Sequence, residues 1–136
     1  MKTLSSLIGT MCAFALIHQA GAAERNYKPE HLEAGQQLFT THCAVCHGDN
    51  AEGRVKNWQE PGADGKLPPP PLNGTAHTWH HSTSALHQTI MQGTLKIGGS
   101  MPPFAGKLGE AESLQIIYWL TSLWPDELFE AWKKQH

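Results

Sequence analysis

An all-α fold of one small domain is predicted by three features of this sequence. Apolar residues recur at spacings of three and four in separate stretches, and no run alternates at the period of a strand. The segments between these stretches are rich in glycine and proline, which interrupt regular elements. About 113 residues follow a short apolar leader, which is enough for one domain with a thin hydrophobic core.

Residues 1–23 are expected to form a secretory signal peptide. Lys2 supplies the positive start, and residues 4–17 form an apolar run that is too short and too interrupted to span a membrane. Small residues at 20–23 suit signal peptidase, and we expect cleavage after Ala23 or one residue earlier, after Ala22. The protein is therefore expected in the periplasm, without stable membrane insertion.

The mature domain is expected over residues 24–136, with two cysteines, because Cys12 leaves with the leader. Loss of Lys2, the one charged residue of the leader, leaves 9 Lys and Arg against 12 Asp and Glu. No basic stripe is present, so a nucleic-acid partner is not expected. With both remaining cysteines in one motif, a structural disulfide is not expected either.

The central motif is Cys43-Ala44-Val45-Cys46-His47. Two cysteines three residues apart, followed directly by histidine, are typical of a covalent c-type haem attachment site. On one helical turn the two thiols can form thioethers to one haem, and His47 can bind its iron. A zinc ribbon would need a second cysteine pair, and a thioredoxin-like site would need a βαβ context, which the sequence does not predict.

Four helices and two long loops are expected around this motif. The first helix runs over 29–43, with proline at its start and acidic residues in its first turn, and a glycine-rich and proline-rich loop follows over 48–74. A second helix is predicted over 82–93, from a serine cap to a glycine, and then a loop over 97–106. The strongest helical pattern covers 110–123, and Pro125 begins a short terminal helix.

The whole mature chain resembles the class I monohaem c-type cytochromes of bacterial periplasms. The resemblance is carried by Gly35 and Phe39 before the cysteine motif, by Pro-Pro-Leu72-Asn73-Gly74 after it, by 98–104 (Gly-Gly-Ser-Met-Pro-Pro-Phe), and by Tyr118-Trp119-Leu120. It implies a small helical domain wrapped around one covalent haem c, with its first and last helices crossing. By this resemblance, Gly35 and Phe39 meet Ile116 and Trp119.

The resemblance also implies the iron ligands. His47 is expected on the proximal side and Met101 on the distal side, a pair that is typical of electron transfer and raises the reduction potential. Met101 lies in a glycine-rich loop before proline, whereas Met91, on a helix face, suits core packing. The family uses a proline carbonyl as hydrogen-bond acceptor for the proximal histidine, which maps to Pro70, with the register uncertain by one residue in the run 68–71.

The sequence departs from the family pattern at His77, His80 and His81. Three imidazoles within five residues can bind copper or zinc. We favour the simpler interpretation of a polar loop before the next helix, with Trp79 packed on the haem.

The function expected from these features is one-electron transport by a soluble periplasmic carrier that is not itself an enzyme. Its redox partners would be a dehydrogenase or quinol-oxidising complex on one side and a terminal oxidase or reductase on the other. Three alternatives stay open: the haem subunit of a dedicated dehydrogenase complex, a peroxidase with an open distal site, and a metal-binding or sensing cytochrome that uses the histidine cluster.

Overall fold

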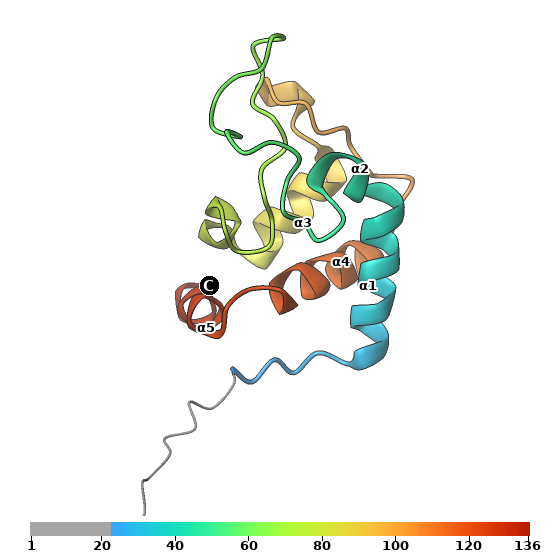
Figure 1. Ribbon diagram of the computed structural model, residues 1–136. Coiled ribbons are helices and arrows are strands. Elements are labelled where there is room, and N and C mark those ends of the chain that lie inside the picture. The colour runs from blue at the N-terminus through green and yellow to red at the C-terminus, as the bar shows by residue number, and fades with distance from the viewer. Residues whose placement is uncertain (1–22) are drawn as a thin grey trace, which may run out of the picture.

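A computed structural model describes residues 23–136, so nearly all of the expected signal peptide lies outside the described residues. The elements run along the chain in the order α1 (Pro29–His42), α2 (Ala44–His47), η1 (His77–His80), α3 (Thr83–Gln92), η2 (Leu95–Ile97), α4 (Glu110–Ser122) and α5 (Asp126–Gln135) (Figure 1). Within residues 23–136 there is no strand, only one isolated bridge between Ala105 and Leu108. The all-α prediction is confirmed.

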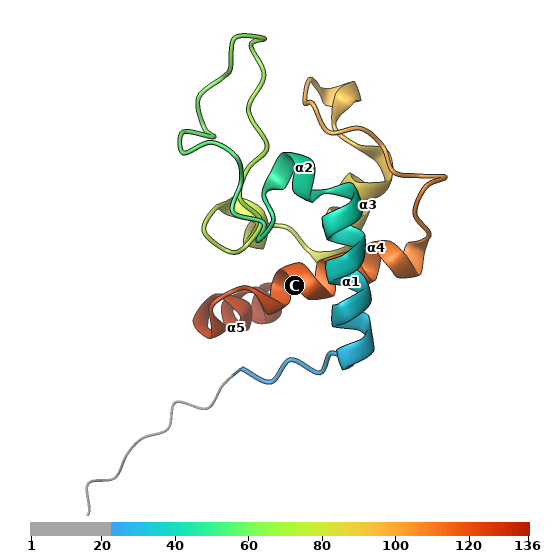
Figure 2. The same ribbon diagram turned by 45° about the vertical axis from the view of Figure 1, so that its right-hand side comes forward.

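Helices α1 and α4 cross at close range, as Figure 2 shows. Gly35 is buried at the crossing, and a Cβ atom added there would lie 2.6 Å from the carbonyl carbon of Gln115 and 3.0 Å from Cβ of Trp119. One turn further on, the rings of Phe39 and Trp119 pack with their centroids 4.7 Å apart. Glycine at position 35 therefore allows the two backbones to touch, and the expected crossing is present with Gln115 as a further contact.

The main core lies between α1, α3 and α4. Its largest fully buried apolar side chains, Phe39, Ile116 and Ile117, are at most 1% exposed. The loop between α3 and α4 and most of the loop between α2 and α3 extend on the side of α4 that carries α2, whereas η1, at the end of the loop between α2 and α3, contacts α5 (Figures 1 and 2). Residues of both loops can therefore contribute to one site beside α2.

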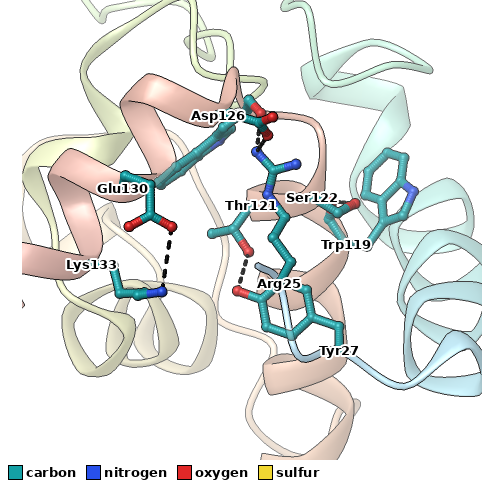
Figure 3. A network of polar contacts seen from close by, with 9 residues as sticks. Arg25, Tyr27, Trp119, Thr121, Ser122, Asp126, Glu130 and Lys133 are labelled. Carbon is teal, nitrogen blue, oxygen red and sulfur yellow. Dashed lines mark hydrogen bonds and ion pairs between the residues drawn. The ribbon is translucent and has the colours of Figure 1, made fainter. Parts of the chain in front are cut away.

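A second hydrophobic cluster joins the two ends of the described chain. Trp124, Phe129 and Trp132 form its buried centre, and Tyr27 packs against it. Figure 3 shows how the N-terminal segment is attached: Arg25 pairs with Asp126 at 2.9 Å, and the hydroxyl of Tyr27 lies 2.9 Å from that of Thr121. This cluster fixes α5 against the rest of the domain.

The predicted helices begin and end close to where the sequence placed them. Ser82 caps α3 by accepting a hydrogen bond from the Ala85 amide, and Gly93 ends that helix at a φ of 67°. The structure adds two short 3-10 turns: η1 forms within the expected polar loop around the histidine cluster, and η2 lies mostly between the predicted second helix and the loop that begins at residue 97. Single turns of three or four residues are too short to show a period.

Candidate functional site

The cysteine motif forms one helical turn directly after α1. Cys43 ends α1, donating its amide to Phe39, and its carbonyl then accepts from the amides of Cys46 and His47 at 3.0 and 2.9 Å. Both thiols are free, with Cys43 buried and Cys46 exposed. The turn therefore presents one thiol at the core and one at the surface, three residues apart.

Burial governs the chemistry of the Cys43 thiol. Desolvation, together with the nearby Cys46, raises the pKa of Cys43 to about 11. A reactive redox cysteine or a metal thiolate is instead favoured by a lowered pKa in an electropositive environment. The environment of Cys43 therefore does not favour its thiolate.

His47 is held in one orientation by the proline-rich segment. Its ring is 9% exposed, and its Nδ1 lies 2.9 Å from the carbonyl oxygen of Pro70. Because that oxygen can only accept, Nδ1 carries the proton and Nε2 is left with a free lone pair. Burial lowers the pKa of His47 below its ordinary value, although the bond to Pro70 acts in the opposite direction. The ring is thus neutral near pH 7, in the form that binds a metal.

Backbone contacts tie the loop after His47 to the proline run. The carbonyl of His47 accepts from the Gly53 amide at 2.6 Å, and the carbonyl of Ala51 accepts from the Leu72 amide at 2.7 Å. Arg54 adds a side-chain contact, donating to the Ala44 carbonyl at 2.9 Å. This role of Arg54 could not be found from the sequence, because an isolated arginine in a loop forms no recognisable motif.

Met101 lies in a loop that is fastened to the end of α3. Its amide donates to the Thr94 hydroxyl at 3.1 Å, and its carbonyl accepts from the Thr94 amide at 2.9 Å. A side chain on Gly93 would collide with this loop, because its Cβ would lie 2.6 Å from backbone atoms of Pro102 and Pro103. The Met101 side chain is half-buried and packs against the main core.

The apolar residues around the main core leave surface that a bound apolar group could cover. Several are only partly buried although they contact the core, and they come from α1, α3, α4 and both loops: Leu38, Leu72, Leu86, Met91, Met101 and Leu114. The same part of the chain supplies two free thiols on one turn and a neutral imidazole with an available nitrogen. This donor set suits haem attached through two thioethers.

The three clustered histidines do not converge on one point. The ring of His77 lies between those of Trp58 and His81, with centroid separations of 5.2 and 5.6 Å, whereas His80 stacks on Trp79 at 3.7 Å. Across residues 23–136, no group of three or more His, Cys, Asp and Glu side chains is arranged to hold a metal ion. The alternative of a copper or zinc site at this cluster therefore has no support in the geometry.

Trp79 has contacts that the sequence did not indicate. Besides stacking on His80, it packs against the second hydrophobic cluster, around Trp124 and Trp132. The contact with α5 joins segments far apart in the sequence, so no local pattern could indicate it. The expected contact between Trp79 and haem stays a prediction.

Several known proteins resemble this chain in sequence. Residues 30–120 match the family model described as cytochrome c oxidase, cbb3-type, subunit III. The cbb3-type cytochrome c oxidase subunit FixPc of Rhizobium leguminosarum bv. viciae is 33% identical over 95 residues, covering 70% of this chain and 29% of that protein. Cytochrome c-L of Methylorubrum extorquens is also 33% identical over 95 residues, covering 68% of this chain and 40% of that protein.

A solved structure shares the fold. Cytochrome CL from the marine methylotrophic bacterium Methylophaga aminisulfidivorans MPT matches with a TM-score of 0.50 and 29% identity, covering 68% of this chain and 55% of that one. The chain spans less than half the length of the two curated relatives. Residues 23–136 include no helix long and apolar enough to cross a membrane.

Proposed function

The chain belongs to the cbb3-type cytochrome c oxidase subunit III family, and we propose that within this family of c-type cytochromes it acts as a soluble periplasmic carrier of single electrons. Its cofactor is covalent haem c, which supplies a one-electron iron couple when bound. The residues of the chain attach this group, orient its ligands and limit the access of water.

We assign the attachment to Cys43 and Cys46 and the proximal iron ligand to His47. The observation that carries this assignment is the 2.9 Å contact from His47 Nδ1 to the Pro70 carbonyl. It fixes the tautomer, leaves Nε2 for the iron and raises the basicity of the ring.

We assign the distal ligand to Met101. Thr94 hydrogen-bonds to both the backbone amide and the backbone carbonyl of Met101. These two bonds limit the positions that the Met101 thioether can take. A thioether ligand favours the reduced iron, which suits a carrier of relatively high potential. With two protein ligands, no iron position stays open for oxygen or substrate, and this is the physical argument against a peroxidase.

The second candidate is a haem subunit bound within a larger complex. It is favoured by the family match and by two relatives named as subunits of cbb3-type oxidases, FixPc and the CcoP protein of Azospirillum brasilense. The similarity to cytochrome c-L, a relative that is not named as an oxidase subunit, supports the carrier instead. In the carrier role, a dehydrogenase or quinol-oxidising complex would donate electrons and a terminal oxidase or reductase would accept them through small, transient contacts.

Fractionation of the native cells tests these two candidates. A carrier is expected in the periplasmic extract after osmotic release, eluting in gel filtration at monomer size with its haem absorbance. If all of the haem-containing protein co-eluted with oxidase or dehydrogenase subunits, in the membrane or the periplasmic fraction, this would contradict the carrier hypothesis and favour the complex. An antibody against the chain identifies its band independently of the haem stain.

A further inference from the structure

Trp124 hydrogen-bonds to the segment that carries Pro70, two residues after that proline. The indole is 2% exposed, and its Nε1 donates to the carbonyl of Leu72 at 2.8 Å. The backbone amide of Leu72 donates to the Ala51 carbonyl at 2.7 Å. Both backbone polar groups of Leu72 are therefore fixed by partners from different parts of the chain.

Only Pro71 separates Leu72 from Pro70. The rings of both prolines hold φ near −65°, so few torsions remain between the clamped peptide and the Pro70 carbonyl. That carbonyl is the acceptor for His47 Nδ1. Fixing the backbone of Leu72 therefore also restricts the position of the Pro70 carbonyl that meets His47.

The loop also lies directly against the start of α5. Gly74 has a φ of 91°, and a Cβ atom there would lie 3.0 Å from Leu128 Cδ2 and 3.2 Å from Trp124 Cδ1. The residues that make this contact lie beyond the 30–120 stretch that the family model covers. The C-terminal part of the chain thus braces a segment of the family domain.

We propose that Trp124 is a positioning residue that keeps the Pro70 carbonyl on His47 Nδ1 and thereby tunes the proximal ligand. This inference rests on the proposed role of His47 as an iron ligand. Without the indole donor, the segment gains freedom and the bond to His47 opens more often. A weaker acceptor makes the imidazole less basic, which stabilises oxidised iron less and raises the reduction potential.

The test compares Trp124→Phe with Trp132→Phe in the haem-loaded protein. Trp132 is a matched control, because it belongs to the same cluster and its Nε1 donates to the His81 carbonyl at 2.8 Å and not to the segment that carries Pro70. Solvent exchange of the His47 Nδ1 proton is measured by NMR in the reduced protein, and the reduction potential by voltammetry.

We expect Trp124→Phe to speed this exchange roughly fivefold, as for loss of one typical hydrogen bond, and to raise the potential. Trp132→Phe should change neither quantity. Equal effects of the two variants, or none from Trp124→Phe, would overturn the positioning role while leaving His47 as ligand. A wild-type His47 ring without haem-induced shifts would overturn the ligation, and the inference with it.

A measurement on the wild type needs no variant. Nitrogen–carbon couplings through the two hydrogen bonds, from Trp124 Nε1 to the Leu72 carbonyl and from His47 Nδ1 to the Pro70 carbonyl, should both be detectable in labelled holoprotein. Absence of the first coupling would overturn the proposal even if the Phe variant failed to fold.

Discussion

Gly35→Ala is expected to weaken the packing of α1 on α4. The new Cβ would lie 2.6 Å from the carbonyl carbon of Gln115 and closer still to its oxygen, whereas ordinary Cβ contacts begin at 3.4 Å. The carbonyl carbon alone requires the helices to separate by about 0.8 Å, the closer oxygen requires more, and backbone atoms cannot rotate out of the way. Overpacking of this kind costs about 3 kcal/mol at the upper end, and the better helix propensity of alanine returns about 1 kcal/mol.

The expected net loss in the free energy of unfolding is about 2 kcal/mol, which lowers Tm by roughly 8 °C for a domain of this size. Guanidinium unfolding of the holoprotein, followed by circular dichroism, measures it. Gly62→Ala is the control, since its nearest neighbour would be 3.4 Å away and its effect should stay within about 0.5 kcal/mol. A Gly35→Ala protein as stable as the wild type would refute the close backbone contact.

Three further predictions concern other residues. Cys46→Ala should leave one thioether and shift the pyridine haemochrome band, whereas haem extractable from the wild type by acid acetone would refute covalent attachment. Burial, and then the neighbouring imidazoles of His81 and His80, lower the pKa of His77. Because the unfolded chain then binds the proton more readily than the folded one, the free energy of unfolding falls as the pH drops below about 6.5. His77→Gln should reduce that fall in a denaturation series over pH, and an unchanged pH dependence would refute the assignment. Tyr27→Phe removes the hydroxyl contact to Thr121 and should cost about 1 kcal/mol in thermal unfolding, and full wild-type stability would show that the contact contributes nothing.

The fold and the attachment motif could be predicted because their signals are local. The periods that mark α1 and α4 are contained in the elements themselves, and Cys43 to His47 form one turn. Gly35 was predictable as a crossing point only through the family resemblance. From the residues alone, a glycine within a helix can equally well have no role in packing.

The contacts that orient His47 could not be derived from local pattern. In a run of four prolines, the carbonyl that meets His47 is chosen by tertiary position, and the structure places Pro70 there. Trp124 and Leu72 are separated by 52 residues, and a tryptophan after the last predicted family helix carries no sign of its acceptor. Such long-range hydrogen bonds follow from how the segments pack, which the sequence encodes only collectively.

The account depends most on the pairing of His47 with Met101 at one covalent haem. The visible spectrum of the oxidised protein tests this pairing directly, because sulfur bound to ferric haem gives a weak charge-transfer band near the red edge of the visible. We predict that the wild type and Met91→Leu show the band and that Met101→Ala loses it and has a lower reduction potential. A band that survives in Met101→Ala and disappears in Met91→Leu would contradict the account.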